Sequence, residues 1–130
     1  MFDIKQGIDI VDIRRINKIC KIYGKKFENR IFSNYELKIL NLNKKILKKK
    51  IEKISGRFAL KEAFSKALGT GISKIFSYHD VEIVDNKNGS PAIIMNKSFN
   101  KILKADDLSI SCSISHEKDY AIGIVTIIIK

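Results

Sequence analysis

The C-terminal segment constrains the fold more than any other part of this sequence. Residues 120–129, YAIGIVTIII, place apolar side chains on both faces of an extended chain. Such a strand needs cover on both faces, so it is either central in a sheet or covered by another subunit. The preceding segment, LSISCSIS at 108–115, alternates apolar residues with serine, which is typical of a strand with one buried face. His116 continues the apolar row, so the end of the chain predicts a β-sheet.

The first part of the chain predicts one short strand and then helices. Residues 7–11, GIDIV, alternate, with Asp9 on the face opposite the isoleucines. Asp12 can cap a helix that Gly24 ends. Ser33 and the glutamate three residues later form a capping-box pattern for a second helix, which we expect to end at about Leu42.

A longer helix is predicted from about Lys48 to Leu68, where glycines end it. Two strand-like segments, HDVEIV and PAIIM, then flank a turn with an Asn-Gly pair, which indicates a hairpin. A short amphipathic helix, NKSFNKILKA, comes before the C-terminal strands. The sequence therefore predicts an α+β fold, an antiparallel sheet with packed helices, in a single domain spanning residues 1–130.

Composition limits the setting and the class of partner. The 130 residues carry 25 Lys and Arg against 14 Asp and Glu, a net charge of +11, which favours anionic partners. Cys20 and Cys112 are too few for a disulfide framework and lack metal-site spacing, which predicts thiols in the cytoplasm. No signal-peptide pattern is present. The longest apolar stretch, residues 121–129, is far shorter than the roughly 20 residues of a membrane-spanning helix, so no membrane association is expected.

The helix ending at Leu68 is more ordered than a purely structural helix requires. Ala59, Ala63 and Ala67 repeat every four residues and form a narrow strip that another backbone or a ligand can approach closely. Glu62 and Lys66 form a second row of the same spacing. An exposed Glu-Lys pair on a solvated face explains that second row without any function.

Asp9 adds a second observation, because a carboxylate in a strand of the core is costly unless it is paired or binds a metal. Together with Glu62 it would offer the hard oxygen ligands that Mg²⁺ prefers. Lys61 or Lys66 could equally neutralise Asp9 in a structural ion pair, so the residues alone leave both interpretations open. His79, His116 and the NGSP turn at 88–91 are first of all surface, core or turn residues.

Four motifs taken together carry a resemblance. They are GIDIVDIRRI at 7–16, GRFALKEAFSKALGTGI at 56–72, NGSPAI at 88–93 and SISHEKDYAIGIV at 113–125. In this order the chain resembles the holo-acyl-carrier-protein synthase family, the small bacterial 4′-phosphopantetheinyl transferases. The KEAFSKALGTG element is the most specific of them. The sequence departs from the family at Leu60, which replaces a commonly small residue, while Ser90 occupies a turn position that varies in the family.

The resemblance implies a fold, a reaction and an assembly. The fold is that of the 4′-phosphopantetheinyl transferases. The reaction is transfer of 4′-phosphopantetheine from coenzyme A to a serine of apo acyl carrier protein in fatty acid biosynthesis, with release of adenosine 3′,5′-bisphosphate. The assembly is a homotrimer with active sites between neighbouring subunits.

The resemblance also implies roles for individual residues. Asp9 and Glu62 resemble the Mg²⁺ ligands, Lys66 the cation beside the pyrophosphate, and His116 a histidine that contacts the cofactor. All four are counted as catalytic. The remaining positions that resemble the family's coenzyme A contacts are Lys48, Lys49, Arg57, Asn88, Gly89, Ser90 and Pro91. The positions that resemble its docking surface for the acidic carrier protein are Arg14 and Arg15, with Lys18 and Lys26 as additions.

Two rival functions follow from the same features. A basic nucleic-acid-binding module would suit the net charge, but the sequence lacks a basic strand interleaved with aromatic residues, so no nucleic-acid partner is expected. A Mg²⁺-dependent phosphohydrolase could use the same metal ligands, with water as the acceptor instead of serine.

Overall fold

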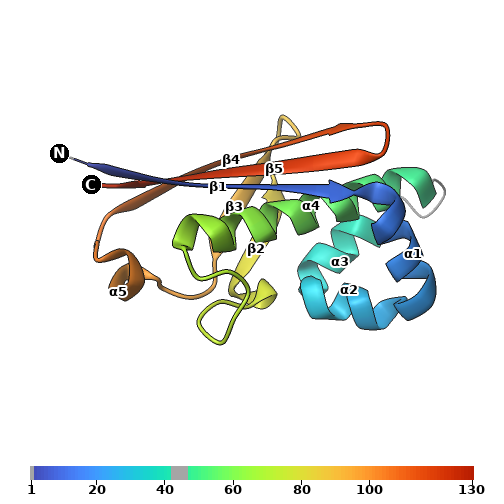
Figure 1. The fold of residues 1–130 in the computed structure, drawn as a ribbon, viewed down its shortest axis with the longest axis horizontal. Coiled ribbons are helices and arrows are strands. Elements are labelled where there is room, and N and C mark those ends of the chain that lie inside the picture. Colours follow the sequence, from blue (N-terminus) through green and yellow to red (C-terminus); the bar gives the residue numbers. More distant parts are fainter. Residues whose placement is uncertain (1, 42–46) are drawn as a thin grey trace.

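The computed structural model describes residues 2–41 and 47–130. Its elements in chain order are β1 (Asp3–Asp12), α1 (Ile13–Tyr23), α2 (Lys25–Ile31), α3 (Asn34–Asn41), α4 (Leu47–Leu68), the 3-10 helix η1 (Tyr78–Asp80), β2 (Val81–Asp85), β3 (Pro91–Met95), α5 (Asn100–Leu103), β4 (Leu108–Glu117) and β5 (Tyr120–Ile129). Figure 1 shows a sheet lying over α4, with both termini at one end and α1, α2 and α3 at the other. The predicted α+β fold, an antiparallel sheet with packed helices, is confirmed.

The larger sheet has three antiparallel strands in the order β1-β5-β4. The C-terminal strand β5 is therefore central, which is one of the two alternatives that its apolar faces indicated. One face of β5 packs on the helices, where Val125 and Ile127 are fully buried. The other face is open in the single chain, and Ile122 and Ile124 remain 36% and 37% exposed on it. The strand is thus both central and uncovered on one side.

The predicted alanine strip of α4 is the surface on which the sheet rests. A Cβ on Gly7 of β1 would lie 1.8 Å from the carbonyl oxygen of Ala63, and one on Gly123 of β5 would lie 2.8 Å from the backbone of Ala59. Only glycine in the strands and alanine in the helix allow the two backbones to come this close. The close approach fixes the position of α4 beneath β1 and β5.

The helical end forms largely as the capping signals predict. The side chain of Asp12 accepts the backbone N–H of Arg14, and Gly24 ends α1 with φ of 52°. The backbone N–H of Ser33 donates to Glu36, whose own N–H donates to the Ser33 hydroxyl, which completes the capping box of α3. The expected helix end at Leu42 lies outside the described residues.

The predictions for the first part of the chain needed two corrections. The strand predicted at residues 7–11 belongs to a ten-residue strand, because β1 pairs with β5 from Asp3 to Asp12. The prediction that Asp9 lies opposite the isoleucines is confirmed, since Ile8 and Ile10 are 58% and 62% exposed on the outer face while Asp9 faces α4. Helix α2 was not predicted at all.

The second sheet is the predicted hairpin of β2 and β3. Its five-residue connection is closed by a hydrogen bond from the N–H of Asn86 to the carbonyl of Ser90. Of the short helix predicted over residues 96–105, only Asn100–Leu103 is helical, as α5. None of the described helices is both long and apolar enough to cross a membrane.

Candidate active site

Strand β1 and helix α4 bring Asp9 and Lys66 together. The Lys66 ammonium donates to Asp9 Oδ1 at 2.9 Å and to the Ile8 carbonyl at 3.1 Å. The Asp9 side chain is 17% exposed and the Lys66 side chain 52%, so the pair opens onto the surface. Of the two lysines considered from the sequence, Lys66 is the one that neutralises Asp9.

Glu62, one turn before Lys66, has a different partner. Its Oε1 accepts a hydrogen bond of 2.7 Å from the hydroxyl of Tyr78 in η1. Burial, together with the hydrogen bond to Glu62, raises the pKa of Tyr78, so the phenol stays a proton donor at neutral pH. The interpretation of Glu62 and Lys66 as a mutually paired, solvated row is therefore wrong, because each pairs with another element.

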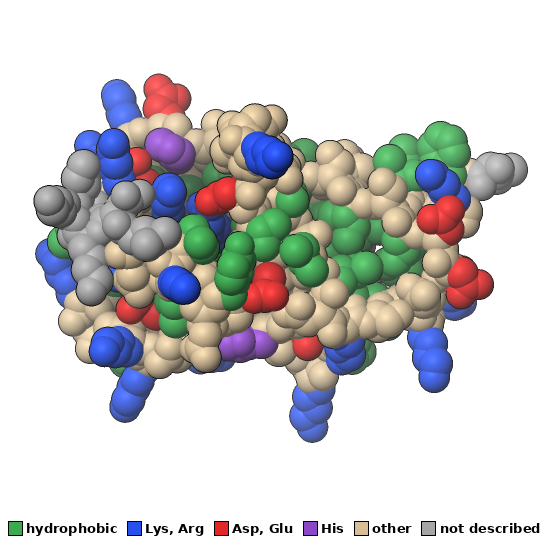
Figure 2. All heavy atoms as spheres, turned by 180° about the vertical axis from the view of Figure 1, so that it is seen from behind, with side chains coloured by type: hydrophobic (Ala, Val, Ile, Leu, Met, Phe, Trp, Pro, Cys, Tyr) green, Lys and Arg blue, Asp and Glu red, His purple; other side chains and the backbone are tan. Residues whose placement is uncertain are grey.

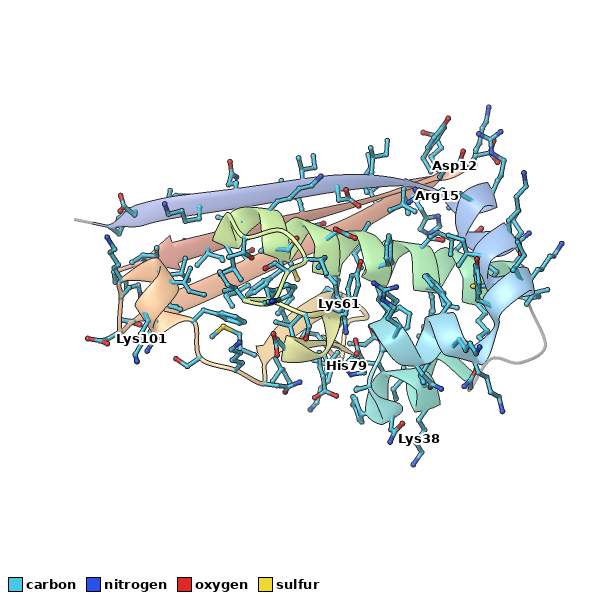
Figure 3. The ribbon with its side chains drawn as sticks, turned by 60° about the horizontal axis from the view of Figure 1, so that its bottom comes forward. Asp12, Arg15, Lys38, Lys61, His79 and Lys101 are labelled. Carbon is cyan, nitrogen blue, oxygen red and sulfur yellow. The ribbon has the colours of Figure 1, made fainter. Side chains whose placement is uncertain are left out.

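Lys61 points from α4 to the opposite side, toward α3 and η1 (Figure 3). Its ammonium is fully buried and donates to Glu36 Oε1 at 2.7 Å and to the carbonyls of Ile31 and Tyr78, both at 2.8 Å. Burial lowers the pKa of Lys61 and the Glu36 carboxylate opposes that shift. The three acceptors match the three protons of an ammonium group, so Lys61 joins the helical end to η1 and is not available to Asp9.

The two carboxylates fit a magnesium ion as donors. Asp9 uses Oδ1 for Lys66 and Glu62 uses Oε1 for Tyr78, while within residues 2–41 and 47–130 no hydrogen bond engages the other oxygen of either. Mg²⁺ commonly takes one or two protein carboxylates and completes its shell with water and phosphate oxygens. The part of the chain that the structure describes holds no cluster of three or more His, Cys, Asp or Glu that could bind a metal. Two carboxylates alone would leave the remaining positions of such an ion to water and phosphate oxygens.

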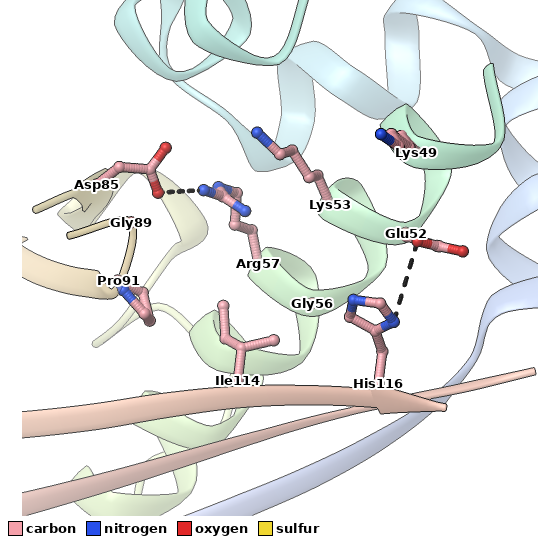
Figure 4. Close-up of a pocket in the computed structure, with 10 residues that line it drawn as sticks. All are labelled: Lys49, Glu52, Lys53, Gly56, Arg57, Asp85, Gly89, Pro91, Ile114 and His116. Carbon is pink, nitrogen blue, oxygen red and sulfur yellow. Dashed lines mark hydrogen bonds and ion pairs between the residues drawn. The ribbon is translucent and has the colours of Figure 1, made fainter. Parts of the chain in front are cut away.

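A groove of about 490 Å³ lies between the other side of α4, the β2-β3 hairpin and β4 (Figure 4). Arg57 pairs with Asp85 at its centre, and the side chains of Arg57 and Asp85 are 10% and 30% exposed. His116 lies 3.9 Å from Glu52 at one end. The groove is lined by Lys49, Glu52, Lys53, Gly56, Arg57, Asp85, Gly89, Pro91, Ile114 and His116.

More than half of the residues predicted to contact coenzyme A line this groove. Lys49, Arg57, Gly89, Pro91 and His116 line it. The other four predicted contacts are not among its lining residues: Lys48, Lys66, Asn88 and Ser90.

The turn explains part of this difference, because its polar side chains bond to one another. Both the N–H and the hydroxyl of Ser90 donate to the Asn88 side chain, at 3.0 and 2.6 Å. His79 is not among the lining residues of the groove; it is an exposed residue of η1, not of a strand, and contacts the Asn29 carbonyl at 2.7 Å.

The groove and the carboxylates lie on different faces of α4. Arg57 and Glu62 are five residues apart, which at 3.6 residues per turn separates their side chains by about 140° around the helix axis. The single chain therefore presents two separate groups of charged side chains, called half-sites below. One is the set of basic side chains in the groove, and the other consists of Asp9, Glu62 and Lys66.

The residues predicted for docking lie on α1 and α2. Arg14 pairs with Asp12 at 2.9 Å and with Asp119 at 3.5 Å, while Arg15 and Lys18 are exposed. Lys26 lines a second groove of about 520 Å³, next to Phe27, Phe58 and Tyr78. Figure 2, drawn from behind, shows Lys and Arg side chains at this end of the molecule and along its lower edge.

Sequence reasoning missed Tyr78, Lys53 and Asp85. Lys53 and Asp85 line the groove, and Tyr78 contacts Glu62. The S-x-x-D pattern of Ser77 and Asp80 signals the capping box that opens η1 and so locates the turn containing Tyr78. No sequence signal links that turn to Glu62.

The fold and the basic groove define a small α+β protein suited to an anionic ligand. Comparison with known proteins is in agreement. The model of the 4′-phosphopantetheinyl transferase superfamily matches residues 6–125, and the chain belongs to this family.

Individual relatives match over nearly the whole chain. Holo-[acyl-carrier-protein] synthase of a Geobacillus species is 42% identical over 122 residues, 93% of this chain and 92% of the relative. The Campylobacter hominis synthase is 45% identical over 124 residues, 92% of this chain and 93% of the relative. The crystal structure of the Helicobacter pylori synthase in complex with coenzyme A has a TM-score of 0.80 at 37% identity, covering 94% of this chain and 98% of its own. These matches confirm the family and the enzyme class predicted from the sequence, a phosphopantetheinyl transferase.

Proposed function

We propose that this chain transfers the 4′-phosphopantetheine group of coenzyme A to a serine of apo acyl carrier protein, as a holo-acyl-carrier-protein synthase of fatty acid biosynthesis acting in the cytoplasm. The observation that carries the proposal is that Lys66 of α4 binds Asp9 of β1, with Glu62 one turn before Lys66 on the same helix. The names of the relatives support the same reaction.

The reaction exchanges one phosphorus-oxygen bond for another. The serine oxygen forms a bond to the β-phosphorus of coenzyme A, and the bond from that phosphorus to the oxygen bridging the two phosphates breaks. The serine proton passes to a base, and adenosine 3′,5′-bisphosphate leaves. Negative charge on the phosphoryl oxygens must be stabilised throughout, so positioning and electrostatics are the main contributions that a protein can make.

The chain offers both signs of charge for this task. Asp9 and Glu62 would hold Mg²⁺, whose chemistry when bound is neutralisation of the phosphate oxygens. The Lys66 ammonium lies beside Asp9 and half exposed, where it can contact the pyrophosphate. Glu62 would also help a water to take the serine proton.

The groove on the other side of α4 suits the adenosine end of coenzyme A. Arg57, Lys49 and Lys53 supply positive charge for its phosphates, and the backbone at Gly89 and Pro91 forms one wall. His116 lies at the end of the groove, where it can donate to the cofactor. Lys48 on the first turn of α4, and Asn88 and Ser90 in the hairpin turn, are proposed as further contacts at the rim.

A homotrimer would join the two half-sites. Within one chain, Arg57 and Glu62 face apart around α4, so one coenzyme A molecule reaches both most simply when a neighbouring copy supplies the second half. The outer face of the sheet supports this arrangement, since it exposes isoleucines on adjacent strands. They are Ile4, Ile8 and Ile10 of β1 and Ile122 and Ile124 of β5.

The acidic carrier protein would dock on the basic surface of α1 and α2. Arg14, Arg15, Lys18 and Lys26 supply its charge, and charge of this kind speeds association at low salt. Reversing both arginines, Arg14→Glu with Arg15→Glu, should raise the KM for carrier protein at low salt, whereas Lys101→Glu on α5 should leave it unchanged. An unchanged KM in the double variant would remove the docking surface from these residues.

The reaction is tested by measuring the release of adenosine 3′,5′-bisphosphate from coenzyme A with and without apo acyl carrier protein. A transferase releases it only when the carrier is present. Release of the same product together with free phosphopantetheine, without any carrier, would instead indicate a Mg²⁺-dependent phosphohydrolase.

A further inference from the structure

Tyr78 joins the buried network of the helical end to the carboxylate half-site. We propose that Tyr78 is a positioning residue, whose hydroxyl orients the Glu62 carboxylate for the divalent cation. The inference rests on the proposed function, because it assigns a role within that function's metal site. None of the motifs that identify the family contains Tyr78.

The position of Tyr78 is fixed from several directions. Its carbonyl accepts a 2.8 Å hydrogen bond from the buried ammonium of Lys61. Its ring packs against Phe58, with 5.8 Å between the ring centroids. The backbone around it is held by the capping box of Ser77 and Asp80. The hydroxyl therefore reaches Glu62 Oε1, at 2.7 Å, from a residue whose backbone and ring are both held in place.

This hydrogen bond restricts how Glu62 can turn. With Oε1 held by the phenol, Oε2 is the oxygen left for another ligand, as no hydrogen bond from the described residues engages it. A carboxylate that is already oriented loses less conformational freedom when it binds a metal, and such supporting hydrogen bonds typically change metal affinity or activity by roughly 10- to 100-fold.

Lys61 and Glu62 are consecutive residues, and one contacts the backbone of Tyr78 while the other contacts its side chain. Lys61 holds the backbone carbonyl and Glu62 receives the hydroxyl. The Lys61 ammonium is in turn bound by Glu36, whose second oxygen accepts the N–H of Ile83. The position of the phenol therefore depends on α3, α4 and β2 as well as on the capping box of η1 itself.

Tyr78→Phe tests the inference, because it removes the hydroxyl and retains the ring against Phe58. The probe is Mn²⁺, titrated into the full-length protein with coenzyme A present and no carrier protein, with free Mn²⁺ measured by electron paramagnetic resonance. We expect the Mn²⁺ dissociation constant to rise about tenfold. The Mg²⁺ concentration for half-maximal transfer should rise with it, while kcat at saturating Mg²⁺ changes much less.

Tyr35→Phe is the matched control, since Tyr35 lies on α3 and is 52% exposed. It should leave both metal titrations unchanged. If Tyr78→Phe binds Mn²⁺ as the wild type does, the inference is overturned, even if its thermal unfolding temperature falls, because the hydroxyl would then serve stability alone. In that case the wild type still transfers phosphopantetheine and the proposed function stands. A wild type that neither binds Mn²⁺ nor modifies a competent carrier would overturn both.

Discussion

At the scale of single residues, the buried pair of Lys61 and Glu36 is the clearest determinant of how the helical end is fixed. The side chains are 0% and 1% exposed, and they connect α4 to the capping box of α3 and, through the N–H of Ile83, to β2. Removing one member of a buried pair leaves the other charge without compensation in a dry environment. Lys61 should therefore matter for stability although it lies next to a proposed catalytic residue.

Lys61→Met should lower the free energy of unfolding by about 3 to 5 kcal/mol. Urea unfolding followed by circular dichroism measures the change. Lys101→Met, at an exposed position of α5, should shift stability by less than about 0.5 kcal/mol. Adding Glu36→Gln to Lys61→Met should recover part of the loss, since the amide keeps an acceptor without the charge. Equal stability of Lys61→Met and the wild type would contradict this account of the pair.

Local sequence patterns indicate the candidate site residues more directly than the residues that support them. Asp9 stands out because a carboxylate interrupts an apolar strand, and the spacing of Glu62 and Lys66 is visible along one helix. Tyr78 could not be found in this way, because its contact with Glu62 depends on a 16-residue excursion of the chain. The pairing of Lys61 with Glu36 spans 25 residues and is equally invisible to local patterns.

At the scale of elements, the packing of the sheet on α4 depends on two strand glycines. The contact of Gly7 with Ala63 is the tighter of the two, because any added Cβ would overlap the helix backbone, which cannot move as a flexible side chain can. The same close approach of β1 and α4 brings Asp9 within hydrogen-bonding distance of Lys66, so it also affects the geometry of the carboxylate half-site.

Gly7→Ala should destabilise the protein by about 3 kcal/mol or more, since the strand must move away from α4. Chemical unfolding is again the measurement. Ser109→Ala, on the exposed face of β4, is the control and should stay within about 0.5 kcal/mol of the wild type. If Gly7→Ala were as stable as the control, the close contact of strand and helix would not be the feature that fixes their separation.

Element prediction succeeded where caps and periodicity agree. Asp12, Gly24 and the Ser33-Glu36 pair mark helix ends at the positions the structure has. Helix α2 was missed because Gly24 ends α1 and, in the same conformation, begins α2, so a stop signal concealed a second start. The length of β1 was underestimated because its first residues alternate poorly and are held by pairing with β5.

At the scale of the whole molecule, the exposed isoleucine face and the two separated half-sites have one explanation in the proposed homotrimer. An apolar sheet face of this kind is typical of an interaction surface. The apolar pattern of β5 indicated that both faces of this strand need cover. The pattern alone left open whether β5 is central in the sheet or covered by another subunit. The trimer remains a prediction.

Ile122→Lys should convert the trimer to monomers, because it places a charge in the proposed interface. Sedimentation velocity gives the assembly state, and the transfer rate should fall with it as the half-sites separate. Ile75→Lys, at a position 51% exposed and away from the sheet face, should remain trimeric and active. A wild type that is monomeric and fully active would contradict the shared site.

The central claim is that the protein transfers 4′-phosphopantetheine to a carrier protein in a metal-dependent reaction, and that Glu62 and Lys66 of α4 take part in it. The most direct test is the intact mass of apo acyl carrier protein after incubation with coenzyme A, Mg²⁺ and this protein, beside a chelator control and the Glu62→Gln variant. The account predicts a gain of one phosphopantetheine group with the wild type that is lost with the chelator and in the variant. No gain with a competent carrier would contradict the proposed reaction, and an undiminished gain with Glu62→Gln would contradict the role of this helix.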